Sequence, residues 1–241
     1  MYGDFATVYD GFMADVPYGD WCAYLHGLIQ TRRPGARRLL DLCCGTGSVS
    51  LGLAALGYDV MGGDLSQDML QRAQEKARDR GQRVPFYRMD MTDFSLINGV
   101  DCITAMCDGI NYLTHHARDD FFRCAYDALL PQGLLLFDFS TQYRLLTALG
   151  DNTFADENDD SAYILVTHRE KEGCSMELTL FFKQGEYYRR GYEEHFLFVH
   201  DPTDLADALY DAGFSQVEAF SFLTVEDIKP QDERIMMIAR R

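Results

Sequence analysis

The first 140 residues alternate between short apolar runs and longer stretches whose apolar residues recur at helical spacing. The short runs are typical of buried strands and cover residues 39–42, 59–63, 85–91, 100–107 and 134–139. The helical stretches cover about 18–31, 48–56, 66–77 and 118–130, and Pro131 and Gly133 are expected to end the last one. Strand and helix in regular alternation predict an α/β fold, with a parallel sheet and helices on both faces.

After Ser140 the apolar period changes from that of a helix to that of a strand. Apolar residues occupy alternate positions over 176–182, and 163–168 and 187–199 are also strand-like. We therefore expect residues 141–200 to form an antiparallel insert packed on the carboxyl edge of the sheet. Beyond it, the sequence predicts a helix that begins at Asp201-Pro202 and ends at Gly213, followed by strands over 216–222 and 234–239.

The stretch LLDLCCGTGSVSLGL, residues 39–53, joins the first strand to its helix through a glycine turn. Such turns build nucleotide sites, because ligands bind beyond the carboxyl ends of parallel strands. The dinucleotide pattern requires a third glycine, and Ser50 occupies that position. Asp41, just before the turn, would repel a pyrophosphate. A carboxylate suits S-adenosylmethionine, which carries a sulfonium, an ammonium and an adenosine but no phosphate.

Further acidic residues follow the next three predicted strands, so that Asp41, Asp64, Asp90 and Asp108 mark four successive strand ends. Asp64 lies 19 residues after Gly45, close to the spacing of about 20 residues expected for a carboxylate that binds ribose hydroxyls. The alternative is that aspartates simply favour strand ends and helix caps. The repetition at four strand ends favours a cofactor site.

These motifs resemble those of the class I S-adenosylmethionine-dependent methyltransferases, over most of the chain. LDLCCGTG is similar to the family's glycine motif, VMGGDLSQDML to its ribose motif, FYRMDMTDF to its adenine-side motif and CDGINYL to the segment beside the methyl group. The opening FATVYDGFMADVPYGDW is similar to the N-terminal lid of small-molecule methyltransferases, including sugar-amine N-methyltransferases and an unassigned bacterial branch. The resemblance implies a Rossmann-like, seven-stranded sheet whose last strand is antiparallel.

The resemblance also implies roles for individual residues. Asp41 and Gly45 would lie near the methionine part of the cofactor, and Asp64 would hold the ribose. Leu65 would flank the adenine, while Asp90 and Met91 would contact it. The remaining cofactor-site positions that the resemblance implies are Cys43, Thr46, Gly47 and Cys107, with Tyr9 and Trp21 closing over the cofactor.

The same comparison suggests how the chain is divided within one compact unit. Residues 1–36 would form a helical lid, and residues 37–140 together with 201–241 the cofactor-binding core. Residues 141–200 would form the substrate-side insert. Asn111 and Tyr112 are expected to face the methyl group, although helix capping and core packing would explain them equally well. His195 would lie on the same strand face as Glu193 and could act as a base, or it could be a hydrogen-bonded structural histidine.

The net charge of the chain limits the kinds of methyl acceptor to be expected. The net charge is −16, from 22 basic and 38 acidic residues, and nucleic-acid binding depends on cationic contacts to phosphates. We therefore predict a small polar metabolite, methylated on nitrogen or oxygen, with nucleic acid unlikely as a partner. An RNA or protein methyltransferase and a non-catalytic cofactor-binding module are the alternatives. The oligomeric state is left open.

The remaining features point to a cytoplasmic protein without a metal. Seven cysteines without a C-x-x-C pattern indicate reduced thiols. Neither a signal peptide nor an apolar run long enough for a membrane span is expected. His115-His116 is interpreted as a helix-entry loop rather than a metal site, since adjacent histidines point apart. The acidic cluster Asp156-Glu157-Asn158-Asp159-Asp160 is interpreted as a solvated loop, with a cation site as the alternative.

Overall fold

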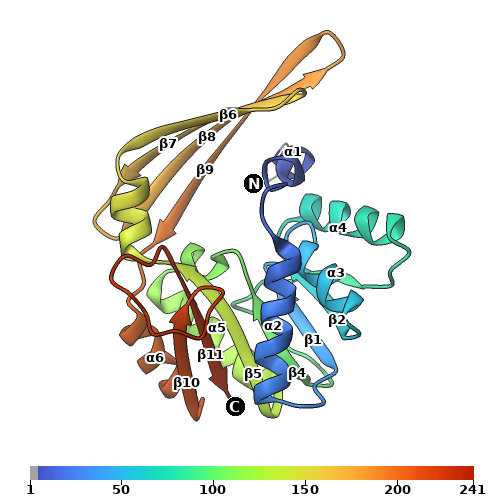
Figure 1. Ribbon diagram of the computed structural model, residues 1–241, viewed down its shortest axis with the longest axis vertical. Helices are drawn as coiled ribbons and strands as arrows, with labels where there is room; N and C mark the ends of the chain where they lie inside the picture. The colour runs from blue at the N-terminus through green and yellow to red at the C-terminus, as the bar shows by residue number, and fades with distance from the viewer. Residues whose placement is uncertain (1–4) are drawn as a thin grey trace.

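The computed structural model describes residues 5–241, and a seven-stranded sheet forms its centre (Figure 1). The strands are β1 (Arg38–Leu42), β2 (Asp59–Asp64), β3 (Phe86–Arg88), β4 (Val100–Ala105), β5 (Leu129–Ser140), β10 (Gln216–Ser221) and β11 (Arg234–Arg240). They lie in the order β10-β11-β5-β4-β1-β2-β3. β11 runs antiparallel to both of its neighbours, and the pairs from β5 to β3 are parallel. The predicted sheet, including its antiparallel last strand, is confirmed.

Helices cover both faces of this sheet, as the alternating pattern predicted (Figure 1). One apolar core joins Leu39 of β1 to α2 (Tyr18–Arg32), α3 (Ser48–Ala55) and α4 (Gln67–Asp79). The other joins Leu40 and Leu42 to α5 (His115–Ala128) and α6 (Pro202–Asp211). Successive strand residues point to opposite faces, so the leucines of this one short strand supply two separate cores.

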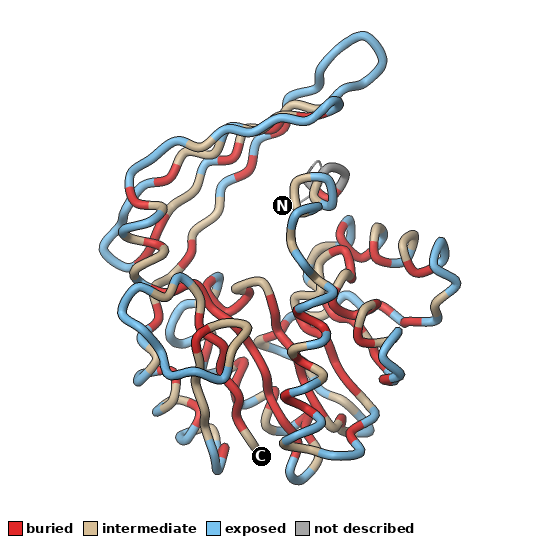
Figure 2. The backbone as a smooth tube through the Cα atoms, in the orientation of Figure 1, coloured by how far each residue is buried: buried red, intermediate tan, exposed pale blue. Residues whose placement is uncertain are grey.

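The insert forms a second, antiparallel sheet above the carboxyl edge of the first (Figure 1). It begins with a turn of π-helix, η2 (Arg144–Leu149), and its strands are β6 (Asn152–Glu157), β7 (Ser161–Arg169), β8 (Gly173–Gln184) and β9 (Tyr187–Phe198). Figure 2 shows that the far end of this sheet is mostly exposed, whereas the central sheet is buried. The antiparallel insert is therefore present, with one strand more than the periodicity indicated.

Three boundary predictions were wrong. Asp156 and Glu157 belong to β6 rather than to a loop; both are exposed, so the strand carries no alternating pattern. α5 begins at His115, because the side chain of Thr114 accepts a hydrogen bond from the Ala117 amide and caps the helix there. It also ends before Pro131, since the chain is already extended at Leu129, where β5 pairs with β4.

The N-terminal residues divide differently from the predicted lid over 1–36. α2 packs into the core through Leu25, Leu28 and Ile29, which are at most 3% exposed, and it belongs to the helical layer of the sheet. Only α1 (Phe5–Phe12) lies above the carboxyl edge (Figure 1). There the ring of Phe12 meets that of Tyr163 in β7 edge to face, with centroids 5.0 Å apart. Of the residues predicted to form the lid, those of α1 therefore lie above the edge and touch the insert, whereas those of α2 do not.

Two other sequence expectations can be compared with the described chain. All seven cysteines are free of disulfides, and burial raises the pKa of the Cys22 and Cys102 thiols to about 12. These two thiols therefore stay protonated at neutral pH. None of the helices within residues 5–241 has the length and apolar character needed to cross a membrane.

The close packing of β2 on β3 makes Gly62 a sensitive position. A Cβ at Gly62 would lie 2.4 Å from Cδ1 of Phe86. We expect Gly62→Ala to lower the free energy of unfolding by about 1–3 kcal/mol, because the buried ring has to shift. Gly27→Ala is the matched control, since no atom lies within 4 Å of its Cβ position in α2. This change should stabilise the helix by about 0.5–1 kcal/mol. Urea denaturation of both variants measures the difference, and equal stabilities would contradict the packing argument.

Candidate active site

The glycine turn after β1 is held in a conformation that few residues adopt. Cys43, Gly45 and Gly47 all have left-handed backbone angles, with φ of 51°, 52° and 77°. A Cβ at Gly47 would lie 2.9 Å from the Phe86 ring and 3.0 Å from Cβ of Ala73. Glycine is therefore required at position 47 by both backbone angle and space, and the turn lies at the carboxyl edge of the sheet.

Asp41 lies beneath this turn and is only 1% exposed. Its carboxylate accepts hydrogen bonds from Oγ of Ser50, at 2.5 Å, and from Oγ1 of Thr104, at 2.7 Å. Burial raises the pKa of Asp41 to about 6, against the lowering effect of these two hydroxyls. Ser50 is the residue that replaces the third glycine of the dinucleotide pattern. The two residues that distinguish this turn from a dinucleotide site, Asp41 and Ser50, are therefore hydrogen-bonded to each other.

Asp64, at the end of β2, borders the other side of the turn. Its Oδ2 accepts a hydrogen bond from the Gly45 amide and its Oδ1 one from the Ser66 amide, both at 2.8 Å. Burial raises its pKa, and these amides oppose the shift. Each carboxylate oxygen has a second lone pair beyond the amide that it accepts. Asp64 therefore has the capacity to accept bonds from two hydroxyls while it holds the turn.

The predicted adenine-side residues lie along the neighbouring loops. Leu65 is 59% exposed directly after β2, and Met91 is buried with its sulfur 3.2 Å from Sγ of Cys43. Asp90 is exposed, and it lies beyond the end of β3 rather than at it, because that strand stops at Arg88. Its carboxylate accepts hydrogen bonds from the amide and hydroxyl of Thr92. An apolar surface and a carboxylate are thus both available on this side of the turn.

A small cavity lies between the turn and the N-terminal residues. Its lining residues are Tyr9, Tyr18, Asp41, Cys43, Cys44, Gly45, Thr46, Ser48, Val49, Met106 and Cys107. Its volume of about 30 Å³ holds roughly one water molecule. Tyr9 closes it from α1 and Tyr18 from the start of α2, and burial raises the pKa of both hydroxyls.

Trp21, which was expected to close over the cofactor, lies in the core instead. It is 6% exposed and packs edge to face on Tyr18 and Phe222, with the guanidinium of Arg234 5.5 Å from its ring. Tyr18, three residues earlier on α2, reaches the cavity in its place. The sequence placed both residues on the same helix but could not tell which of them faced the turn.

Four polar side chains fasten α1 over the glycine turn. Asp10 Oδ1 accepts hydrogen bonds from the Thr46 hydroxyl, at 2.6 Å, and from Nζ of Lys76, at 2.8 Å. Lys76 also donates to the hydroxyls of Thr46 and Ser48, at 3.0 and 3.1 Å. We call Asp10, Thr46, Ser48 and Lys76 the α1 latch. Asp10 and Lys76 could not be predicted from the sequence, because nothing in either local pattern indicates a contact between residues 66 positions apart.

An ion cluster forms the part of the carboxyl edge next to β11. Arg234 pairs with the buried carboxylate of Asp138 and lies 3.4 Å from the carboxylate of Asp108. Burial raises the pKa of Asp138 to about 6, and the arginine opposes that shift. Asp108 also accepts a hydrogen bond from the Ser140 hydroxyl at 2.6 Å. Asp108 thus fixes the junction between β4, β5 and β11.

The three predicted substrate-side residues, Asn111, Tyr112 and His195, lie in different surroundings. Asn111 is fully buried, and its amide donates to the carbonyls of Ser140 and Phe198 while its oxygen accepts from the Ser140 amide. These hydrogen bonds anchor the insert to the sheet. Tyr112 is 40% exposed, and its ring lies edge to face on that of His195, with centroids 5.9 Å apart. Nε2 of His195 lies 3.4 Å from Oε2 of Glu193, and both side chains are less than 10% exposed.

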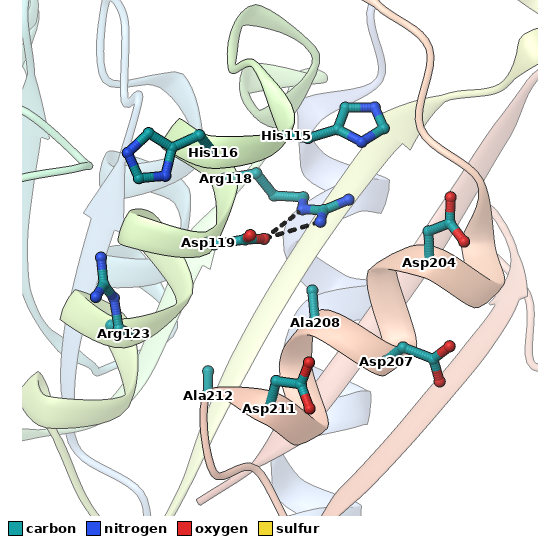
Figure 3. A pocket seen from close by; sticks show the side chains of 10 residues that line it. All are labelled: His115, His116, Arg118, Asp119, Arg123, Asp204, Asp207, Ala208, Asp211 and Ala212. Carbon is teal, nitrogen blue, oxygen red and sulfur yellow. Dashed lines mark hydrogen bonds and ion pairs between the residues drawn. The ribbon is translucent and has the colours of Figure 1, made fainter.

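A second, wider groove of about 480 Å³ lies between α5 and α6, away from the glycine turn (Figure 3). Arg118, Arg123 and the two adjacent histidines come from α5, and Asp204, Asp207 and Asp211 come from α6. Figure 3 shows the rings of His115 and His116 pointing in different directions. Within the described chain, no three His, Cys, Asp or Glu side chains are grouped so as to hold a metal.

His200 is a further buried residue of this region that the sequence did not single out. It is 1% exposed, and its Nε2–H donates to the carbonyl of Ile110, next to Asn111, at 3.2 Å. Burial, with the charges of Arg118 and His115 on α5, lowers its pKa to about 4. The neutral ring therefore supports the short 3-10 helix η1 (Gly109–Tyr112), which carries Tyr112.

Comparison with known proteins agrees with this geometry. Residues 39–133 match a family model described as a methyltransferase domain. YqeM of Bacillus subtilis (strain 168), which bears a provisional methyltransferase name, is 32% identical over 100% of this chain and 97% of its own length. A dTDP-3-amino-3,4,6-trideoxy-alpha-D-glucopyranose N,N-dimethyltransferase of Streptomyces venezuelae is 26% identical over 88% of each chain.

A solved structure extends the likeness to the whole fold. The crystal structure of an S-adenosylmethionine-dependent methyltransferase from Clostridium acetobutylicum ATCC 824 is 26% identical and superposes with a TM-score of 0.90. The match covers 99% of this chain and 98% of the other. The insert and α1 are thus parts of a shared architecture rather than additions to this chain.

The buried neutral ring of His200 predicts a loss of stability in mild acid. Its pKa is lower in the folded protein, about 4, than its ordinary value of 6.5. Its contribution is therefore complete above pH 6.5 and is lost as the pH falls towards 4, and at pH 5 the loss is roughly 2 kcal/mol. Asp41 and Asp138 act in the opposite direction, since their pKa values of about 6 favour the folded state as the pH falls.

A variant comparison separates these effects. His200→Gln keeps an N–H donor but cannot titrate, so the stability advantage of wild type over this variant should shrink between pH 7 and pH 5. Urea denaturation across that range measures the difference. His116→Gln is the control, because the His116 side chain is 89% exposed. If the difference in unfolding free energy between wild type and His200→Gln did not change with pH, burial would not be lowering the pKa of His200.

Proposed function

The chain belongs to the class I S-adenosylmethionine-dependent methyltransferases, and from this premise we propose that it methylates an amine nitrogen of a small polar metabolite. The observation that carries the proposal is the buried Glu193–His195 pair on the insert, in contact with Tyr112 of η1, the helix whose first residue, Gly109, packs on Cys43 of the glycine turn. A relative that acts on an amino sugar supports the same class of acceptor.

The residues around the turn fit the cofactor by their chemistry. In the proposal, the carboxylate of Asp64 accepts the two ribose hydroxyls while the Gly45 and Ser66 amides hold it in place. Leu65 packs on the adenine, and Asp90 with Met91 contacts its edge. The main chain of Gly45, Thr46 and Gly47 lies against the methionine part, and the buried carboxylate of Asp41 stabilises the nearby positive charge. Cys43 and Cys107 complete this wall.

Entry of the cofactor requires α1 to move. A cavity of about 30 Å³ is far smaller than the few hundred Å³ of an ordinary ligand site. Tyr9 and the α1 latch account for the closure, since they connect α1 to the turn and to α4. We infer that α1 opens to admit the cofactor and then returns, with Tyr9 as the part of the lid nearest the reaction.

On the acceptor side, Glu193 and His195 supply a negative charge and a proton acceptor. S-adenosylmethionine supplies a methyl group on a sulfonium, which is transferred by in-line displacement. An amine attacks only when its nitrogen has a free lone pair, so an ammonium has to lose a proton first. His195 accepts that proton, and Glu193 Oε2, 3.4 Å from Nε2, stabilises the imidazolium. Tyr112 holds the imidazole ring from the side of η1.

The charge of the protein argues against a nucleic-acid acceptor. With a net charge of −16, the surface repels polyphosphates at long range. The acceptor-side pair is enclosed by the insert, with both side chains less than 10% exposed. Such an enclosed position suits a small molecule better than a nucleotide inside a folded RNA.

The ribose role of Asp64 can be tested by affinity. Asp64→Ala removes two charge-assisted hydrogen bonds, each worth about 1.5–3 kcal/mol, so the affinity for S-adenosylhomocysteine should fall at least tenfold. Isothermal titration calorimetry measures it, with circular dichroism as the check on folding. Asp59→Ala is the matched control, because Asp59 is exposed at the opposite end of the same strand. An unchanged affinity in Asp64→Ala would mean that Asp64 only caps α4 through Ser66.

The acceptor class can be tested by transfer of a labelled methyl group. We expect transfer to one or more members of a panel of small amines, such as glucosamine, ethanolamine and glycine, and none to the corresponding alcohols. In His195→Gln, kcat for that amine should fall at least tenfold at pH 7 and recover at high pH, where the amine loses its proton unaided. His168→Gln, on the exposed side of the insert, is the control. Preferential methylation of tRNA or rRNA would refute the amine proposal.

A further inference from the structure

We propose that β9 pairs with β9 of a second copy of this chain, so that two inserts form one continuous eight-stranded sheet. The two β9 strands would run antiparallel about a two-fold axis at Tyr192. This inference is independent of the acceptor proposed above. It depends on the open edge of the insert, the direction of its backbone groups and the order of charges along it.

β9 is a long edge strand. It has 12 residues, and among residues 5–241 only β8 pairs with it. Its first half lies in the part of the insert that projects beyond the central sheet (Figure 1). The far end of the insert is exposed (Figure 2), and Tyr187 and Tyr188 there are 78% and 58% exposed. Proteins normally shield such an edge, because it is a template for pairing with another chain.

The hairpin fixes which backbone groups point to the open edge. β8 and β9 are joined by the two residues Gly185 and Glu186, and Gly185 has a φ of 66°. Gln184 and Tyr187 therefore close the hairpin as a hydrogen-bonded pair, and such pairs alternate along the ladder. It follows that the odd-numbered residues of β9 bond to β8. The amides and carbonyls of Tyr188, Arg190, Tyr192, Glu194 and Phe196 point the other way.

The side chains of Arg190, Tyr192 and Glu194 form a row of cation, aromatic ring and anion on one face. The Tyr192 hydroxyl lies 2.7 Å from Oε1 of Glu194, and the guanidinium of Arg190 lies 6.0 Å from the Tyr192 ring centre. Rotation about an axis at Tyr192 places Arg190 of each copy opposite Glu194 of the other. An axis at Arg190 would instead oppose two arginines, and one at Glu194 two glutamates. Charge therefore selects the register centred on Tyr192.

The insert alone leaves a like-charge contact that this pairing would relieve. Glu194 lies directly opposite Glu177 of β8 on the same face. The single hydroxyl of Tyr192 is shared between them, at 2.7 and 3.2 Å, and the two carboxylates raise the pKa of Tyr192 to about 12. Like charges directly opposite each other on a sheet are destabilising. Arg190 from a second copy would add a cation to this pair of carboxylates.

A charge swap tests the partner. Analytical ultracentrifugation over a micromolar concentration series should show a dimer for the wild-type chain. Arg190→Glu and Glu194→Arg should each weaken it at least tenfold, and the double variant should recover the wild-type constant. Lys171→Glu makes the same charge change at the other end of the insert sheet and should have no effect. A monomeric wild type, or a double variant no better than the single ones, would overturn the proposal.

A disulfide test reads the register directly and does not depend on the strength of the dimer. Opposite residues of a hydrogen-bonded antiparallel pair have Cα atoms about 5.5 Å apart, within the range that a disulfide spans. Tyr192→Cys should therefore form a symmetric covalent dimer under mild oxidation. Tyr188→Cys should not, because Phe196 of the other copy lies opposite it. Equal cross-linking of both variants, or of Tyr188→Cys alone, would refute the register. Thermal unfolding before oxidation confirms that each variant is folded.

Discussion

A carboxylate buried near the end of β1 holds the glycine turn in place. Asp41 joins three elements, since its oxygens accept hydrogen bonds from Ser50 of α3 and Thr104 of β4 while the residue itself belongs to β1. Burial alone would favour the neutral acid, and the two hydroxyls stabilise the anion. The charge that suits a sulfonium ligand is therefore available only because these three elements meet at one point.

A few buried contacts also fix the position of the insert. The Asn111 amide donates to the carbonyls of the last residue of β5 and the last residue of β9, so one side chain defines where the second sheet leaves the first. The ring of His200 donates a hydrogen bond to the carbonyl of Ile110, the residue before Asn111. The result is that Tyr112, between the two sheets, keeps a defined position relative to His195. The side of the site proposed to bind the acceptor is thus positioned by buried polar contacts.

Much of this could be predicted from the sequence, because the signals were local. The leucines of β1, the glycines at 45 and 47 and the aspartate that ends β2 each indicate their own environment, and the sheet order follows once the family is identified. β6 was missed because an exposed edge strand has no alternating face. Tyr18 and the α1 latch were missed because they depend on how α1 and α2 are oriented in space. For the same reason Trp21 was placed at the cofactor instead of in the core.

The α1 latch has a consequence for how quickly the enzyme can exchange its cofactor. Three hydrogen bonds join Asp10, Thr46 and Lys76, and the cavity beneath them is closed. If α1 opens to admit the cofactor, as proposed, only the fraction of molecules with α1 displaced would accept the ligand, and the apparent affinity would be reduced by that fraction. If the product left by the same path, the lifetime of the closed state would set an upper limit on turnover.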